Sequence, residues 1–275
     1  MKYVFFGTPE FSADILGALV RAGMPPVALI TNPDRPRGRR KVISPPPTKE
    51  LAFGLGAGIA VLQPERLDED FIREIGAFGA ECGVLAAYGT IVPKEVIAAF
   101  PKGIVVVHPS LLPRYRGATP IQSAIVAGDA ETGTTLFLMD ERVDHGPVIA
   151  FATEPIMDTD TYATLAKRLA ARSAELLIDA LPKYCAGDIA PQVQDDARAT
   201  YTKKLVSADG FVDMKETAPE VIWRMVRALN PEPGVWALQD SKRVKLLEAD
   251  LTDGKLVIRK FQFEGGLPRT DGFGL

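Results

Sequence analysis

The chain has 275 residues, of which 47% are hydrophobic and 24% are charged, and this composition excludes disordered and fibrous proteins. Its 32 basic and 35 acidic side chains give a formal net charge of −3, so the molecule as a whole is not a nonspecific binder of polyanions. At about 100–200 residues per domain, the length predicts one large domain or two unequal ones. The sequence shows neither a signal peptide nor a run of about 20 apolar residues that could span a membrane, so we expect a soluble protein of the cytoplasm.

The N-terminal part of the chain predicts a parallel sheet covered by helices. A buried strand at residues 3–6 leads into Gly7-Thr8-Pro9, where Thr8 can cap a helix whose apolar side chains recur with helical spacing as far as Gly23. A second strand at residues 27–31 completes a strand–helix–strand unit, which favours parallel strands. The same alternation then predicts strands at 60–62, 82–87 and 104–107, and helices at 49–55, 68–78 and 94–99.

Residues 32–47 break this alternation. They contain five prolines and five basic residues but only one acidic residue, and such a segment is not expected to form regular structure. A long loop inside a compact domain is usually functional or disordered. In an arbitrary protein the simplest interpretation of its charge is a solvated surface loop.

The middle of the chain predicts further helices and strands before the composition changes. We expect helices at 121–127 and 161–181, and strands at 134–139 and 148–154. The polar, proline-containing stretch that follows favours a domain boundary. We therefore predict a first domain at 1–188, a linker at 189–206 and a second domain at 207–275.

The second domain is expected to be small and rich in β-structure. A helix at 219–229 precedes short strands at 235–238, 244–251 and 256–263. These strands are fewer than a closed barrel requires, so a reduced barrel is predicted.

Two sequence features resemble known ligand-binding motifs but lack the spacing or the context that those motifs require. Gly54, Gly56 and Gly58 form a GxGxG run, but it precedes a strand, whereas a dinucleotide-binding fingerprint follows a strand and opens a helix. The two cysteines, Cys82 and Cys185, lack the paired spacing and the neighbouring histidines of a zinc site. We expect no metal and a reducing compartment.

The only two histidines each lie in a cluster of charged residues. His108 follows the strand at 104–107, with Arg114 and Arg116 close behind it, and ligands bind at the carboxyl ends of parallel strands. The second cluster, at residues 140–147, contains Asp144. The simpler alternative for His108 is a histidine that only hydrogen-bonds a loop carbonyl at the end of its strand. The simpler alternative for residues 140–147 is an ordinary surface turn. If the two clusters converge, an aspartate and a histidine can orient each other and shift proton affinity.

An ordered series of motifs extends along nearly the whole chain. The segments lie at residues 6–11, 33–38, 87–93, 108–117, 118–122, 128–133 and 139–147, and the longest reads HPSLLPRYRG. In these segments the chain resembles the formyltransferase family that uses 10-formyltetrahydrofolate, and within it the members that formylate methionyl-tRNA. The resemblance implies an α/β, Rossmann-like catalytic domain with a mostly parallel sheet, and a small β-rich, OB-like C-terminal domain.

The resemblance also implies a reaction. The α-amino group of methionyl-tRNA attacks the formyl carbon and a tetrahedral oxyanion forms, with His108 as donor or proton-transfer group and Asp144 orienting His108 or an ordered water. The family carries an asparagine two positions before the histidine, and its amide helps to bind the formyl oxygen. This chain has Val106 there, which has no side-chain donor. We expect a compensating donor, low activity, or a relative that binds without transferring formyl.

Binding residues follow from the same resemblance. The folate is expected at Ala87, Tyr88, Gly89, Ser110, Leu111, Leu112, Pro113 and Asp140, where backbone groups can hold a flat pterin. The acceptor arm of initiator tRNA is expected at Arg35, Arg37, Arg39, Arg40, Lys41, Lys203, Lys204, Lys242, Arg243 and Lys245, with Arg259 and Lys260 as an extension of that surface.

Three other functions compete with this prediction. A formyltransferase of glycinamide ribonucleotide needs neither the basic loop nor the second domain, and residues 33–38 argue against one of amino-sugar nucleotides. Val106 motivates the third, a noncatalytic protein that binds tRNA or folate. In each case we expect a monomer.

Overall fold

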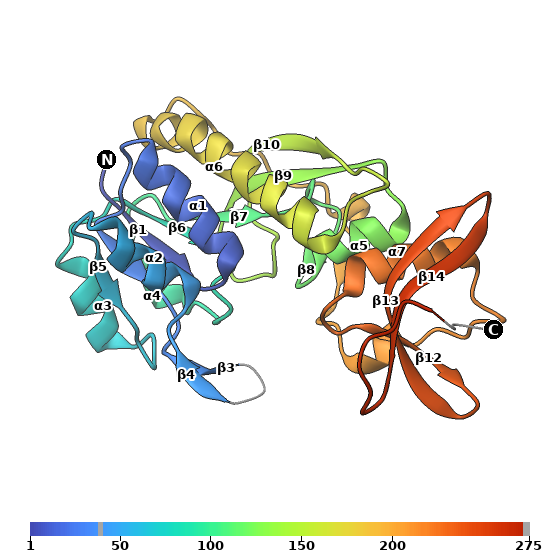
Figure 1. The fold of residues 1–275 in the computed structure, drawn as a ribbon. Coiled ribbons are helices and arrows are strands. Elements are labelled where there is room, and N and C mark those ends of the chain that lie inside the picture. The colour runs from blue at the N-terminus through green and yellow to red at the C-terminus, as the bar shows by residue number, and fades with distance from the viewer. Residues whose placement is uncertain (38–40, 272–275) are drawn as a thin grey trace. The chain divides into compact units, whose positions relative to one another are not determined.

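The computed structural model describes residues 1–37 and 41–271, and the chain forms two compact units (Figure 1). The first unit comprises Met1–Arg116, Gly133–Glu154 and Ala166–Thr200. The second unit comprises Gly117–Thr132, Pro155–Leu165 and Tyr201–Leu275. Among the described residues, no helix is both long enough and apolar enough to cross a membrane.

The first unit is built on a seven-stranded sheet with the order β10-β9-β7-β6-β1-β2-β5. Its strands are β1 (Tyr3–Gly7), β2 (Ala28–Ile30), β5 (Ala60–Leu62), β6 (Cys82–Ala86), β7 (Ile104–His108), β9 (Glu131–Leu138) and β10 (Val148–Pro155). The five strands from β7 to β5 run parallel, whereas β9 pairs antiparallel with β7. The prediction of a mostly parallel sheet is confirmed.

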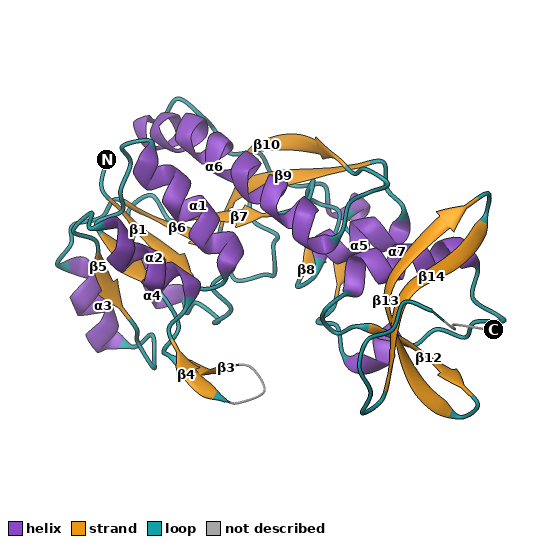
Figure 2. Cartoon of the chain, viewed as in Figure 1, coloured by secondary structure: helices purple, strands orange, loops and turns teal. Residues whose placement is uncertain are grey.

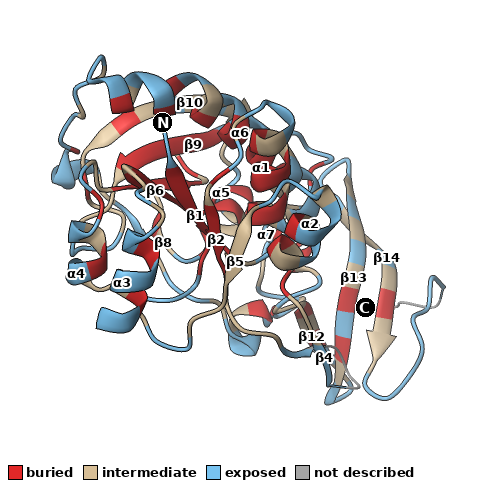
Figure 3. Cartoon of the chain, turned by 90° about the vertical axis from the view of Figure 1, so that its left-hand side faces the viewer, coloured by how far each residue is buried: buried red, intermediate tan, exposed pale blue. Residues whose placement is uncertain are grey.

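Helices cover both faces of this sheet, because successive side chains of a buried strand point to opposite faces (Figure 2). One core cluster joins Phe5 and Val105 to apolar residues of α1 (Glu10–Arg21) and α6 (Tyr162–Ala186). The other joins Phe6 and Val106 to residues of α3 (Glu69–Gly76) and α4 (Lys94–Ala98). Helix α2 (Pro47–Leu55) contributes Ala52 to the first cluster. Figure 3 shows the central strands as buried throughout and the helices as buried on one side only.

Two expectations for the N-terminal part are wrong. Thr8 does not cap α1, because its hydroxyl donates to the Tyr88 carbonyl at 3.0 Å and Pro9 occupies the capping position. Part of the basic segment is regular, since β3 (Arg35–Arg37) pairs antiparallel with β4 (Val42–Ser44). A two-stranded hairpin tolerates Pro36 because each strand needs donors on one side only.

The second unit contains a small antiparallel sheet, as expected from the sequence. Its strands β12 (Val235–Gln239), β13 (Lys242–Thr252) and β14 (Lys255–Phe263) pair in chain order. Helix α7 (Pro219–Leu229) packs on β13 and against α5 (Pro120–Ala127). Two short elements belong to the second unit, namely β11 (Tyr201–Thr202) and the 3-10 turn Ser207–Gly210. The 3-10 turn Asp196–Arg198 belongs to the first unit, and β8 (Arg116–Gly117) lies at the boundary in the chain.

Candidate active site

Hydrogen bonds tie together the carboxyl ends of three neighbouring strands. The Tyr88 carbonyl, just past β6, accepts from the Thr8 hydroxyl at 3.0 Å and from Asn32 Nδ2 at 2.9 Å. Thr8 follows β1 and Asn32 follows β2, so one carbonyl joins all three strand ends. His108 closes the adjacent strand β7. This is the sheet edge at which open α/β folds bind ligands.

Both ring nitrogens of His108 face protein groups, and the residue is only 5% exposed. Nε2 lies 3.0 Å from the Tyr115 carbonyl, and Nδ1 lies 3.6 Å from Asp144 Oδ2. A carbonyl only accepts, so Nε2 carries the hydrogen and Nδ1 is the proton-accepting nitrogen of the neutral ring. The loop-carbonyl contact considered from sequence is therefore present, and the convergence of His108 with Asp144 is present as well.

Asp144 lies in the loop at residues 140–146, called here the acidic loop, between β9 and β10. Its backbone adopts the left-handed region at φ 47°, where a non-glycine residue is uncommon. Within the same loop Asp140 Oδ2 lies 2.6 Å from His145 Nδ1, and Asp140 Oδ1 accepts from the backbone N–H of Arg142 at 2.9 Å. Asp140 thus helps to shape the loop that carries Asp144.

Val106 lies on the same side of β7 as His108, because the intervening Val107 belongs to the opposite core cluster. Its register partners are Leu85 on β6 and Phe137 on β9, and it is 5% exposed. The surroundings of Val106 are therefore apolar, and its own side chain supplies no hydrogen-bond donor.

The segments expected to bind folate offer backbone groups rather than polar side chains. The Tyr88 ring is 2% exposed and packs edge-on against Phe6, and burial raises the pKa of its phenol to about 12. Ala87 and Gly89, on either side of it, are exposed and have positive φ angles. The backbone of this strand end is accordingly open to a ligand while its aromatic side chain belongs to the core.

Thr135 on β9 fixes the Ser110–Pro113 segment. Its hydroxyl donates to the Ser110 carbonyl at 2.7 Å and accepts from the Leu112 N–H at 3.2 Å. The Ser110 hydroxyl is buried and donates to the Arg114 carbonyl at 2.7 Å. This segment is therefore held in one conformation next to His108.

The basic residues expected to bind tRNA occupy both units. In the first unit, Arg35 and Lys41 are exposed, and Arg35 lies 3.2 Å from Glu65 in a solvent-exposed pair that adds little stability. Arg39 and Arg40 lie outside the described residues, and of Arg37 only the backbone is described.

In the second unit, two of the expected tRNA residues have structural partners. Lys203 pairs with Asp209 at 2.6 Å, and Arg243 lies over the Trp236 ring at 4.2 Å. Lys204, Lys242 and Lys245 are exposed. Arg259 and Lys260 form ion pairs with Asp250 and Glu248, respectively.

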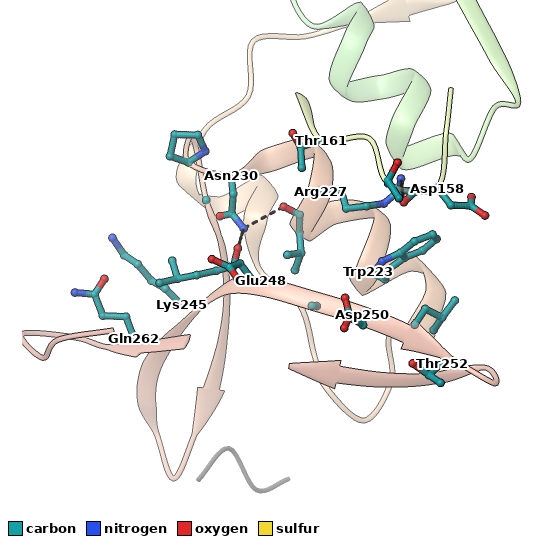
Figure 4. Close-up of a pocket in the computed structure, with 17 residues that line it drawn as sticks. Asp158, Thr161, Trp223, Arg227, Asn230, Lys245, Glu248, Asp250, Thr252 and Gln262 are labelled. Carbon is teal, nitrogen blue, oxygen red and sulfur yellow. Dashed lines mark hydrogen bonds between the residues drawn. The ribbon is translucent and has the colours of Figure 1, made fainter. Parts of the chain in front are cut away.

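A pocket of about 920 Å³ opens in the second unit between α7 and β13 (Figure 4). Arg227 lies on its wall, 3.9 Å over the Trp223 ring, and its Nη1 donates to the carbonyls of Met157, Asp158 and Asp160. The Arg227 guanidinium is therefore engaged by backbone carbonyls of the second unit itself. Lys245 is the one expected tRNA residue among the residues that line this pocket.

Sequence reasoning missed a polar cluster that contacts the acidic loop and consists of Arg116, Gln194 and Asp196. Arg116 is fully buried, and its guanidinium donates to Gln194 Oε1 at 2.8 Å and to Asp196 Oδ1 at 2.8 Å. The hydrogen bond and charge of Arg116 hold the pKa of Asp196 below its usual range. Gln194 and Asp196 fall in the segment assigned to the linker, and no local pattern in the sequence connects them with Arg116.

Family models match most of the chain. Residues 1–181 match the model described as Formyl transferase, and residues 204–261 match Formyl transferase, C-terminal domain. The chain therefore belongs to the formyl transferase family, which confirms the resemblance found in the motifs. The methionyl-tRNA formyltransferase of Halorhodospira halophila is 43% identical over 254 residues, which cover 92% of this chain and 81% of that protein.

Solved structures share the fold at much lower identity. Methionyl-tRNA formyltransferase from Clostridium thermocellum has a TM-score of 0.65 at 16% identity, covering 96% of this chain and 98% of that chain. HypX from Aquifex aeolicus, solved in complex with tetrahydrofolic acid, has a TM-score of 0.66 at 17% identity, covering 98% of this chain and 46% of that chain. These likenesses confirm the Rossmann-like fold with its small β-rich C-terminal part.

Proposed function

We propose that this protein transfers the formyl group of 10-formyltetrahydrofolate to the α-amino group of methionyl-tRNA in the cytoplasm. The observation that carries the proposal is the His108–Asp144 pair at the carboxyl end of β7, with Nδ1 and Oδ2 3.6 Å apart. The family match and a methionyl-tRNA formyltransferase at 43% identity support the reaction and the acceptor.

The geometry supports a proton-transfer role for His108. As the amine attacks the formyl carbon, it loses a proton, and Nδ1 is the ring nitrogen able to take it because Nε2–H donates to the Tyr115 carbonyl. The carboxylate of Asp144 then stabilises the imidazolium. When the bond from the formyl carbon to the folate nitrogen breaks, the imidazolium returns the proton to that nitrogen.

The donor substrate fits the exposed backbone of Ala87 and Gly89, the fixed segment from Ser110 to Pro113, and Asp140. The acceptor tRNA fits the basic residues of the β3–β4 hairpin and of the second unit, where phosphate contacts give affinity. Val106 leaves the formyl oxygen without the amide that the family uses, so turnover is expected to be slow.

A single-turnover assay tests this proposal. Enzyme in excess is mixed with methionyl-tRNA and 10-formyltetrahydrofolate, with uncharged tRNA as the control. Glycinamide ribonucleotide and an amino-sugar nucleotide are offered in parallel reactions. We expect formyl transfer to methionyl-tRNA alone. Transfer to either of the other acceptors, or binding of tRNA with no transfer to any acceptor, would reject the proposed function.

A further inference from the structure

Both polar groups of the Gln194 side-chain amide form hydrogen bonds, the nitrogen with the acidic loop and the oxygen with the buried Arg116 guanidinium. Its Nε2 donates to the Asp144 carbonyl at 3.0 Å and to the Gly146 carbonyl at 2.8 Å. Its Oε1 accepts from Arg116 Nε at 3.1 Å and from Arg116 Nη2 at 2.8 Å. Gln194 is 9% exposed, so few of these contacts can be exchanged for water.

Arg116 decides which way this amide points. A guanidinium only donates, so it selects the oxygen of the glutamine and turns the NH₂ group toward the loop carbonyls. Asp196 fixes Arg116 in turn through the contact at 2.8 Å. The orientation of the Gln194 amide therefore follows from the chemistry of its neighbours.

The backbone that Gln194 holds is an unfavourable one. Asp144 has φ 47°, in the left-handed region that non-glycine residues adopt uncommonly. At Gly146 a Cβ atom would collide with the Leu138 carbonyl oxygen, so only glycine fits there. Two hydrogen bonds from one amide fix both residues at once and so maintain the turn that directs the Asp144 carboxylate to His108.

We propose that Gln194 is a positioning residue for formyl transfer, acting on Asp144 through the loop backbone without contacting the substrates. The inference rests on the proposed function. Asp144 faces His108, whereas Gln194, which lies outside the acidic loop, fixes the backbone conformation of the loop that carries Asp144.

The test compares Gln194→Glu with Gln192→Glu. Gln194→Glu keeps the shape of the side chain and an oxygen that accepts from Arg116. It removes the NH₂ group that donates to the carbonyls of Asp144 and Gly146. Gln192→Glu makes the same chemical change at an exposed side chain two residues earlier. We expect kcat to fall by about 10²-fold for Gln194→Glu, as misplacement of a reacting group does, with KM for methionyl-tRNA unchanged. Its pH–rate profile should shift, and Gln192→Glu should match the parent.

An NMR measurement provides a readout besides activity. The chain has only two histidines, so the ring signals of His108 can be assigned with a His145→Gln variant. We expect the titration curve of the His108 ring to change in Gln194→Glu and to stay at the parent's position in Gln192→Glu. A parent that transfers no formyl would reject the proposed function, and the NMR comparison would still decide the role of Gln194.

For the glutamate variant, two outcomes would overturn the inference. One is a Gln194→Glu variant with the parent's kcat, pH–rate profile and His108 titration curve. The other is a loss of activity that parallels a lower melting temperature and disappears on cooling, with the His108 titration unchanged. Gln194→Asn covers the case in which the glutamate variant does not fold, because its amide keeps both donors and is too short to reach Arg116 and the loop together. A folded asparagine variant with the parent's kcat and His108 titration would also overturn the inference.

Discussion

Nδ1 of His108 lies 3.6 Å from Oδ2 of Asp144, although His108 ends strand β7 and Asp144 lies in the acidic loop between β9 and β10. Neither side chain is open to bulk water, since they are 7% and 19% exposed, respectively. The interaction between an imidazolium and this carboxylate is therefore weakly screened, so Asp144 can stabilise the cationic ring during proton transfer.

Replacement of His108 by alanine should lower kcat by about 10²–10⁴-fold, the range that positioned acid–base groups contribute. Binding of methionyl-tRNA should stay near that of the parent, because His108 is almost fully buried and offers no surface to the nucleic acid. Single-turnover rates and filter binding measure the two effects. Near-parental turnover would remove His108 from the mechanism.

Replacement of Asp144 by asparagine should reduce the rate of transfer and change its dependence on pH. The carboxylate faces the ring nitrogen that takes the proton, and a neutral amide cannot stabilise the imidazolium formed there by charge. The measurement is kcat as a function of pH for parent and variant. Glu141→Gln, which makes the same chemical change at an exposed residue of the same loop, is the comparison variant. A profile identical to the parent's would show that Asp144 does not act on His108.

The Val106→Asn substitution should raise formyl transfer and lower the melting temperature. An amide at this position shares the face of His108 and can donate to the oxyanion, an interaction that is worth about 10²–10³-fold in studied enzymes. Its apolar neighbours, Leu85 and Phe137, leave it without a partner in the resting protein, at a cost of about 1–3 kcal/mol. Val106→Ala adds space and no donor, so an equal gain in that variant would attribute the effect to room in the pocket.

The basic hairpin should contribute to tRNA binding through phosphate contacts. Replacing Arg35, Arg37 and Lys41 by alanine should weaken binding and flatten its log–log salt dependence by about 0.7–0.9 per lost contact. The matched control replaces three exposed basic residues of α6, namely Lys167, Arg172 and Lys183. Equal salt slopes in the two triple variants would show that the hairpin does not contact tRNA.

The free energy of unfolding should fall as pH rises above about 9. Burial raises the pKa of the Cys82 and Cys185 thiols, whose sulfur atoms lie 3.6 Å apart in the core. Above their ordinary pKa of 9.0 the unfolded chain releases protons that the folded chain retains, so alkaline pH favours unfolding. Urea melts of the parent and of a Cys82→Ala/Cys185→Ala variant, compared from pH 7 to 10, measure the effect. The parent should lose more stability, and parallel curves would contradict the expectation.

Local patterns in the sequence predicted most of the fold, because strands such as β7 are continuous apolar runs and helices such as α7 have an apolar face. They failed where a distant partner decided the outcome. Thr8 has the chemistry of a helix cap, but the Tyr88 carbonyl competes for its hydroxyl. The β3–β4 hairpin is a pairing between short strands that proline makes hard to recognise.

Sequence motifs identified His108 and Asp144 as candidate residues. The two residues meet because β7 and β9 are neighbours in the sheet. No motif could locate Gln194, since a glutamine in a polar stretch is ordinarily a solvated side chain. Its position depends on Arg116, a residue whose complete burial is visible only once the chain has folded.

The stretch after α6 also affects how fragments of this protein should be designed. Gln192 exchanges two backbone hydrogen bonds with Val148, at 2.7 and 2.8 Å, and Thr200 accepts one from Arg116 at 2.8 Å. A gene fragment ending at residue 188 would encode His108 and Asp144 and yet omit every one of these attachments. Expression trials of an N-terminal fragment should therefore extend to Thr200, the last residue of the first unit, so that the hydrogen bonds to Val148 and Arg116 are kept.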